Sequence, residues 1–161
     1  MQYLTQPTQQ LGQAQSGHKL FQLEYAVAIE IAAPAEAVWQ ILTRAQDYPR
    51  WNSTVVSLSG DIVLGGKLIL VSQIAPKQPF KLNITALQAP QRMVWQSGQR
   101  FFFGGERTYS LQATPEGVIF TMREVFQGLM LPLIAKALPD FRANFNQFAA
   151  DLKAAAESRP V

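Results

Sequence analysis

Three residues whose side chains could take part in chemistry are Arg107, Tyr109 and Glu124. They lie on two apolar segments, residues 107–113 and 118–126, which are separated by a four-residue turn. If Ala113 pairs with Val118, the segments form an antiparallel hairpin in which opposite residues share a face. The resulting pairs are Leu111 with Phe120, Tyr109 with Met122, and Arg107 with Glu124. Because every pair but the last is apolar or aromatic, we predict that this face is buried and carries an ion pair. A bulge at Gly117 would shift the register by one residue and break the pairing.

A charged pair on an inner face has two interpretations. In the first, it is a structural ion pair that is partly solvated and contributes little net stability. Alternatively, it orients a polar group of a ligand, because small-molecule sites combine apolar walls with a few convergent polar groups. Glu124 and Tyr109 are also the catalytic candidates, as proton-transfer groups of an enzyme, although the sequence supplies no partner acid.

Apolar residues of the same face and of the last helical segment are expected to form the walls of such a cavity. The predicted ligand-binding residues are Arg107, Glu124, Tyr109, Trp95, Phe103, Met122, Phe141 and Phe145. The phenylalanines of the last helix are core residues by default, and they line a cavity only in a fold that contains one. The sequence leaves open whether this cavity is empty or filled by its own side chains.

Three consecutive phenylalanines, Phe101 to Phe103, stand directly before Gly104 and Gly105. Strand alternation sends Phe102 to the face opposite its two neighbours unless the chain bends, which the glycines permit. We predict that the rings form a pocket rim or cavity lid. Core filling is the second interpretation, and membrane contact is the third because no basic amphipathic helix accompanies the rings.

The composition argues against several classes of site. The chain has no cysteine and one histidine, His18, so thiolate chemistry, a histidine-based triad and a metal site are not expected, and no cofactor is expected either. The 14 Lys and Arg residues form no basic stripe, which argues against a nucleic-acid partner. No apolar run reaches the roughly 18 residues of a membrane span. Without a signal-peptide pattern, we expect a cytoplasmic protein with no stable membrane insertion.

Hydrophobic periodicity predicts the elements that position these residues. Residues 1–19 are rich in glutamine and are expected to be a flexible leader, followed by one domain over residues 20–157 and a tail over residues 158–161. Residues 21–31 alternate as a strand does, and Pro34 suits the start of a helix over residues 35–44. Residues 47–52 then form an aromatic corner.

After the corner, the hydrophobic pattern is first that of strands and then, from Met130, that of a helix. Six short apolar runs, separated by turn signals, predict an antiparallel meander. The runs cover residues 55–58, 68–74, 80–87, 93–97, 107–113 and 118–126. From Met130 the apolar residues step by three and four, which predicts a long amphipathic helix that Pro139 kinks or divides. The fold class is therefore α+β, with the last helix covering the sheet.

These landmarks occur in the order of a known superfamily. The segments that carry the resemblance are residues 29–39 (IEIAAPAEAVW), 48–52 (YPRWN), 103–107 (FGGER), 123–129 (REVFQGL) and 131–133 (LPL). Together they resemble the SRPBCC, or START-like, superfamily, which includes polyketide cyclase-like proteins and the birch-pollen allergen. The resemblance implies a helix-grip fold, in which a curved seven-stranded antiparallel sheet surrounds the long C-terminal helix and two short helices follow the first strand.

The resemblance also implies a cavity for a small hydrophobic molecule, such as a lipid, polyketide, steroid or isoprenoid. The first hypothesis is a protein that binds or carries such a ligand, with Arg107 and Glu124 as its polar anchor. The second is a polyketide cyclase or dehydratase that moves a proton with Glu124 or Tyr109. A third is a protein-interaction role that uses the rings of Phe101 to Phe103 as an exposed patch. The ligand and the oligomeric state are not defined by these residues.

Overall fold

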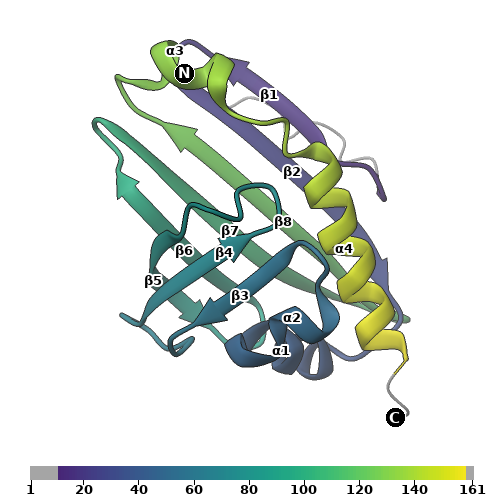
Figure 1. Cartoon of the computed structure of the whole chain (residues 1–161). Helices are drawn as coiled ribbons and strands as arrows, with labels where there is room; N and C mark the ends of the chain where they lie inside the picture. The colour runs from purple at the N-terminus through teal and green to yellow at the C-terminus, as the bar shows by residue number, and fades with distance from the viewer. Residues whose placement is uncertain (1–10, 159–161) are drawn as a thin grey trace.

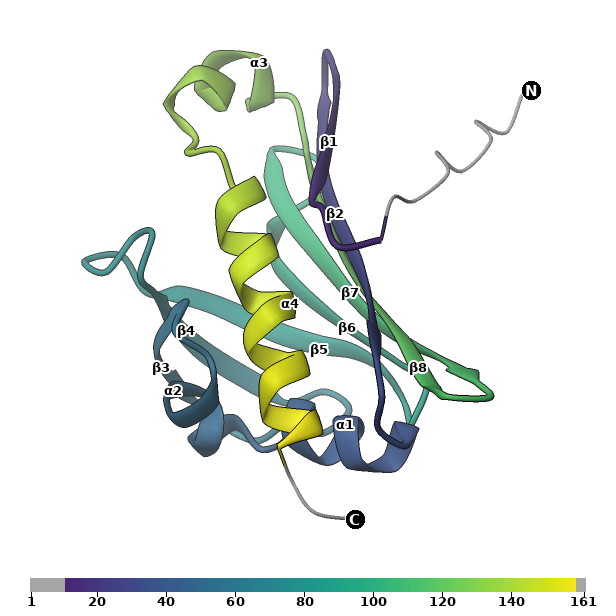
Figure 2. The same cartoon turned by 90° about the vertical axis from the view of Figure 1, so that its right-hand side faces the viewer.

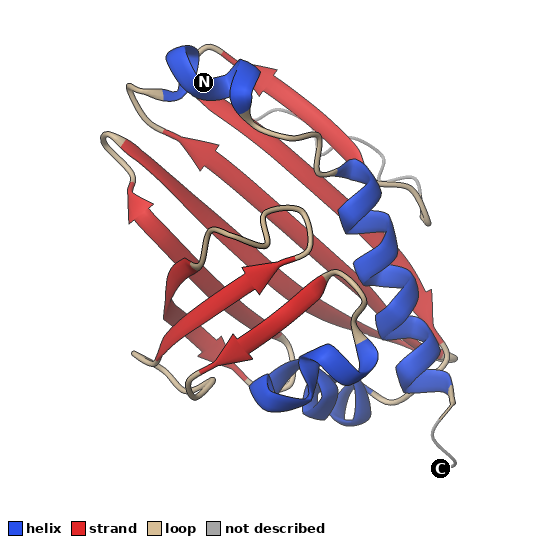
Figure 3. Cartoon of the chain, viewed as in Figure 1, coloured by secondary structure: helices blue, strands red, loops and turns tan. Residues whose placement is uncertain are grey.

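The computed structural model describes residues 11–158 and contains one curved antiparallel sheet with a long helix across its concave face (Figures 1 and 2). The strands lie in the order β1-β2-β8-β7-β6-β5-β4-β3. Their bounds are β1 Gln15–Lys19, β2 Gln22–Ile31, β3 Val55–Ser59, β4 Lys67–Ser72, β5 Phe80–Gln88, β6 Arg92–Gln99, β7 Phe103–Thr114 and β8 Gly117–Gln127. The helices are α1 Ala35–Thr43, α2 Tyr48–Trp51, α3 Leu131–Ile134 and α4 Arg142–Glu157, with 3-10 turns η1 Ala45–Asp47 and η2 Ala135–Ala137. Figure 3 shows that the helices gather on one side of the sheet.

The hairpin of β7 and β8 has the predicted register. Ala113 pairs with Val118, and the pairing continues in step through Arg107 opposite Glu124. The inward residues Phe120 and Met122 of β8 are completely buried, as the apolar pattern requires. No bulge occurs in this hairpin. The prediction that an Arg–Glu pair lies on the inner face is therefore confirmed.

The sheet has one strand more than the seven expected. Residues 15–19, which the sequence assigns to the leader, form β1 and pair with β2 from Gln15 opposite Ala26 to Lys19 opposite Gln22. This strand is mostly exposed and carries no apolar alternation, so periodicity does not detect it. It forms because β2 presents an edge of backbone donors and acceptors that β1 satisfies. Of the remaining predicted leader, residues 11–14 precede β1, whereas residues 1–10, like residues 159–161 of the tail, lie outside the described residues.

The corner after α1 is held by a buried tyrosine. The hydroxyl of Tyr48 donates to the backbone carbonyl of Leu42 at 2.7 Å, and Tyr48 is completely buried. This bond turns the chain back so that Trp51, at the end of α2, meets Phe148 of α4 with 5.6 Å between ring centroids. The predicted aromatic corner therefore packs against the helix that crosses the sheet.

The C-terminal helical segment is divided near Pro139, as predicted. The short helices α3 and η2 end at Ala137, and α4 begins at Arg142 after Asp140 accepts a hydrogen bond from the backbone N–H of Arg142 at 3.0 Å. The apolar stripe of α4 faces the sheet through Phe145, Phe148 and Leu152. No helix within residues 11–158 combines the length and the hydropathy needed to cross a membrane.

Candidate functional site

Arg107 and Glu124 are joined by two hydrogen bonds on the inner face of the sheet. Nε and Nη2 of Arg107 both donate to Oε2 of Glu124, and the Nε···Oε2 distance is 3.0 Å. The side chains of Arg107 and Glu124 are 15% and 12% exposed, so solvent reaches the pair only at its edge. Neither Nη1 of Arg107 nor Oε1 of Glu124 takes part in these bonds. The pair therefore keeps one donor group and one acceptor oxygen for another molecule.

The guanidinium of Arg107 also contacts the helix across the sheet. Its Cζ atom lies 5.2 Å from the ring centroid of Phe145 on α4, a distance typical of a cation–π contact. Burial is the largest single influence on the pKa of Arg107 and lowers it, but the charges of and hydrogen bonds to Glu124 and Tyr109 together raise that pKa above its ordinary value. Arg107 is thus a permanent cation held between β8 and α4.

Tyr109 lies two residues further along β7 on the same face and is completely buried. Burial raises the pKa of Tyr109 to about 12, although the positive charge of Arg107 opposes the shift. The phenol therefore stays protonated at neutral pH and can donate a hydrogen bond. Within residues 11–158, neither its oxygen nor Nε1 of the neighbouring Trp95 has a hydrogen bond of good geometry, although the guanidinium of Arg107 lies close enough to the phenol oxygen to act on its pKa. Because buried polar groups are normally paired, these two groups favour a site for a ligand atom.

Aromatic side chains fill the space beyond Arg107, toward α1 and α2. The ring of Tyr109 lies 4.9 Å from that of Trp95 and 5.9 Å from that of Phe148 on α4, measured between centroids. Four predicted wall residues, Trp95, Tyr109, Met122 and Phe145, are at most 1% exposed. The side chains themselves therefore occupy this part of the expected cavity, which we call the packed half of the inner face.

The other part of the inner face, from the Arg107/Glu124 pair to the turn between β6 and β7, is less covered, and we call it the open half. Phe103 stacks on Phe126 with centroids 6.1 Å apart, and Phe126 lies 5.5 Å from Phe141. Phe103 and Phe126 are only half-buried, whereas Phe141 is buried. The Arg107/Glu124 pair therefore stands at the boundary between a packed aromatic core and an aromatic surface that solvent still reaches.

The three consecutive phenylalanines separate into two environments. Phe103 belongs to the inner face, whereas Phe101 and Phe102 occupy the turn between β6 and β7 and are 66% and 55% exposed. Phe101 and Phe102 are therefore not part of the inner wall, and their role as a rim or lid stays a prediction. The two rings contact each other edge to face, with their centroids 5.1 Å apart.

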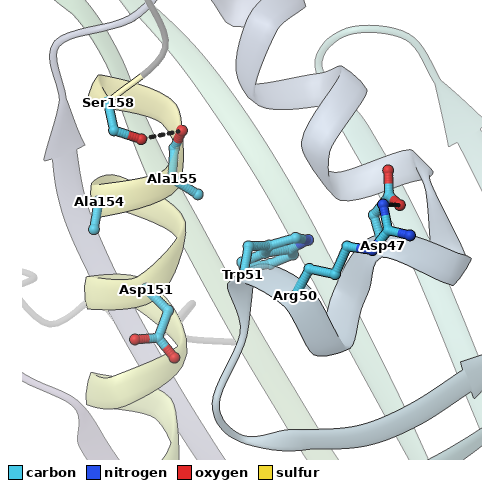
Figure 4. Close-up of a pocket in the computed structure, with 7 residues that line it drawn as sticks. All are labelled: Asp47, Arg50, Trp51, Asp151, Ala154, Ala155 and Ser158. Atoms are coloured by element: carbon cyan, nitrogen blue, oxygen red, sulfur yellow. Dashed lines mark hydrogen bonds and ion pairs between the residues drawn. The ribbon is translucent and has the colours of Figure 1, made fainter.

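A surface hollow of about 560 Å³ lies elsewhere, between α2 and the C-terminal part of α4 (Figure 4). It is lined by Asp47, Arg50, Trp51, Asp151, Ala154, Ala155 and Ser158. Its charged groups already have partners, because Arg50 pairs with Asp47 at 3.3 Å and Asp151 accepts two hydrogen bonds from Ser53. No predicted site residue lines this hollow. Within residues 11–158, no three His, Cys, Asp or Glu side chains gather as a metal site.

Sequence comparison identifies the family. Residues 22–157 match the family model described as polyketide cyclase / dehydrase and lipid transport. The chain belongs to this family. The match runs from the start of β2 to the end of α4, so it includes both strands and the helix that carry Arg107, Glu124 and Phe145. A search of curated proteins finds no match.

Solved structures place this family member in the fold that the sequence predicts. Protein MLL2253 from Mesorhizobium loti is 16% identical with a TM-score of 0.68, and the alignment covers 86% of this chain and 99% of that chain. A START superfamily protein from Mycobacterium smegmatis is also 16% identical, with a TM-score of 0.60 and coverages of 85% and 97%. The di-domain ARO/CYC BexL from the BE-7585A biosynthetic pathway is 13% identical with a TM-score of 0.69, and the alignment covers 88% of this chain and 52% of BexL. These likenesses confirm the helix-grip fold, and the family match confirms the predicted relationship to polyketide cyclase/dehydrase proteins.

Sequence reasoning missed two residues of the open half. Phe126 stacks on Phe103, and Gly105 stands opposite Phe126 in the hairpin. A Cβ atom on Gly105 would lie 3.3 Å from the ring of Phe126, so the glycine lets this ring lie against the sheet. The register that pairs Arg107 with Glu124 also pairs Gly105 with Phe126 and would have found both residues.

Proposed function

We propose that this protein binds or carries a small, mainly apolar molecule on the inner face of the sheet and holds one polar group of that molecule with Arg107. The observation that carries the proposal is the mostly buried Arg107/Glu124 pair, whose Nη1 and Oε1 atoms are not used within the pair. A hydroxyl, carbonyl or acid group of the ligand would match this donor and acceptor. The finding that the family includes lipid-transport proteins supports the same class of ligand.

The ligand would lie in the open half, against Phe103, Phe126 and Phe141. These rings supply apolar area, and the pair at their inner end supplies orientation, a combination typical of small-molecule sites. A larger ligand would also enter the packed half, where the unpartnered groups of Tyr109 and Trp95 would gain hydrogen bonds. The aromatic rings between β7 and α4 would then have to move apart. Binding of the ligand would favour this more open conformation of the protein over the packed one.

Native mass spectrometry of freshly purified full-length protein, followed by solvent extraction, tests the proposal. We expect a discrete apolar compound from the wild type. The compound should be reduced in Arg107→Met, which keeps a flexible unbranched stem but removes the charged guanidinium. The matched control is Arg123→Met, because Arg123 forms a similar pair with Glu24 on the outer face of the same sheet.

A second measurement uses anilinonaphthalene sulfonate, an apolar probe with one anionic group. We expect Arg107→Met to weaken probe binding by about tenfold, the loss typical of one charge-assisted hydrogen bond, and Arg123→Met to leave binding unchanged. Equal binding by all three proteins, together with an extract that contains no bound compound, would show that the inner face is a filled core without a ligand.

The alternative is a cyclase or dehydratase that uses Glu124 or Tyr109. The unpartnered phenol of Tyr109 favours this alternative, because a buried acid near a bound substrate can deliver a proton. The two hydrogen bonds from Arg107 to Glu124 act against it, because they occupy one oxygen of the carboxylate that would have to accept the proton. An enzyme would release different compounds from wild type and Tyr109→Phe, differing by one water, whereas a carrier would release the same compound from both.

A further inference from the structure

Three turns meet at the end of the molecule where α3 lies (Figure 1). They are the turn between β1 and β2, the turn between β6 and β7, and the segment from Gly128 into α3. The backbone N–H of Gly128 donates to the carbonyl of Phe21, that of Leu129 donates to Phe101, and that of Met130 donates to Phe102, at 3.2, 3.0 and 2.9 Å. Hydrogen bonds therefore join segments that are far apart in the sequence into one unit.

This unit exposes large apolar side chains from all three segments, and we call these residues the apolar end. They are Leu20, Phe21, Phe101, Phe102, Leu129, Met130 and Leu133. Buried packing does not explain them, because each is more than two-fifths exposed. A grouped set of exposed apolar residues on a monomer marks an interaction surface.

Each segment of the apolar end also carries an exposed cation. Lys19 directly precedes Leu20, Arg100 directly precedes Phe101, and Lys136 follows Leu133 by three residues. Arg100 stays accessible, since its side chain is 67% exposed and its nearest carboxylate, on Glu106, lies 3.9 Å from Nη1. Aromatic and aliphatic tips beside lysine and arginine match the boundary of an anionic bilayer, where the rings enter the acyl region and the cations contact headgroups.

We propose that the apolar end docks the protein onto the surface of an anionic lipid membrane. The charge pattern favours this occupant over a second copy of the chain, because two apolar ends face to face would bring six cations together. The contact is peripheral, made by turn tips, and involves no membrane-spanning helix. The apolar end adjoins the open half, since Phe103 follows Phe102 directly and starts β7. Docking would thus bring the open half close to the lipid surface.

Co-sedimentation with vesicles tests this proposal, using phosphatidylcholine alone and phosphatidylcholine mixed with phosphatidylglycerol. We expect the full-length protein to bind the mixed vesicles more strongly and to lose binding as salt rises, because salt screens the lysines and arginine. Phe101→Ser combined with Phe102→Ser should reduce partitioning by about tenfold or more, since two rings no longer enter the bilayer. Phe101→Trp should retain binding, because tryptophan favours the interface.

The chain offers matched controls. Val63 and Leu64 are also exposed apolar residues, in the loop between β3 and β4 near α1, so Val63→Ser with Leu64→Ser should leave partitioning unchanged. Lys19→Gln with Lys136→Gln should remove the preference for anionic vesicles, whereas Lys67→Gln with Lys81→Gln should retain it. Thermal unfolding of each variant ensures that only folded proteins are compared.

Two results would overturn the proposal. One is equal sedimentation of the wild type and the Phe101→Ser/Phe102→Ser variant with mixed vesicles. The other is concentration-dependent dimerisation of the wild type in light scattering, abolished by the same double substitution, without vesicle binding. The second result would identify the apolar end as a contact between protein chains. Neither result would affect the Arg107→Met test of the inner face, so this proposal and the proposed ligand-binding function fail independently.

Discussion

Arg107 of β7 lies against Phe145 of α4, with 5.2 Å between the guanidinium carbon and the ring centroid. The same guanidinium donates two hydrogen bonds to Glu124 of β8. One cation therefore contacts the sheet and the helix that covers it. Changes at the Arg107/Glu124 pair are expected to alter both stability and the position of α4 over the inner face.

Replacing one partner of the Arg107/Glu124 pair should lower the free energy of unfolding more than replacing both partners. Glu124→Leu leaves a mostly buried cation without its acceptor and should lower the free energy of unfolding by about 3 kcal/mol. Arg107→Met combined with Glu124→Leu should lie within about 1 kcal/mol of the wild type or above it, because no buried charge remains. Urea unfolding of the double-mutant cycle measures the coupling, and strictly additive effects would contradict it.

Tyr109→Phe should keep or raise stability while weakening ligand binding. The hydroxyl is buried and makes only a weak interaction with Arg107, so its removal should leave the free energy of unfolding unchanged or raise it by up to about 1 kcal/mol, and the ring contacts with Trp95 and Phe148 remain. Urea unfolding and probe titration measure the two effects. A clear loss of stability would mean that the hydroxyl has a partner in solution.

The same tyrosine predicts a loss of stability at alkaline pH. Because the folded pKa of Tyr109 is raised from 10.0 to about 12, its contribution is complete below pH 10 and is lost as pH rises toward 12. The full loss is about 2–3 kcal/mol, from about 1.4 kcal/mol for each unit of pKa shift. Tyr109→Phe should decline less than the wild type over this window in denaturant titrations at stepped pH. Burial also raises the pKa of Tyr48, so part of the loss of stability at high pH should remain in both proteins.

Two phenylalanines should differ widely when each is replaced by alanine. Phe148 packs among Tyr48, Trp51, Tyr109 and Phe120, so Phe148→Ala should lower the free energy of unfolding by about 3–5 kcal/mol. Phe102→Ala removes an exposed ring and should change it by less than about 0.5 kcal/mol. Chemical denaturation compares the two, and similar losses would mean that Phe102 is buried in solution.

Three glycine-to-alanine substitutions should differ in how far they lower stability, according to the backbone conformation and the free space at each glycine. Gly128 has φ 138° and a Cβ there would lie 2.2 Å from the carbonyl oxygen of Phe102, so Gly128→Ala should destabilise most, by more than about 1 kcal/mol. Gly65 has φ 78° with open space around it, so Gly65→Ala should cost about 1 kcal/mol. Gly17→Ala, with neither constraint, should be nearly neutral. Differential scanning calorimetry gives the order, and Gly128→Ala should also weaken vesicle binding.

The sequence alone determined the hairpin that carries the candidate site. Alternation of apolar residues and a four-residue turn sufficed to pair Arg107 with Glu124, because a strand repeats every two residues and a hairpin links positions close in the chain. Pro139 likewise marked the break before α4, since proline lacks a backbone donor. These features depend on local rules, which a reader of the sequence can apply.

Only the tertiary structure decided what those residues meet. Phe145 and Phe148 come to lie against Arg107 and Tyr109 because α4 crosses the sheet, and no periodicity specifies how the rings interlock or fill the space. Strand β1 forms on an edge that β2 offers, although its own residues are polar. The apolar end assembles from three turns through backbone hydrogen bonds, which carry no signal in side-chain patterns. Contacts between distant segments depend on the complete packing of the chain, and local propensity contains no record of that packing.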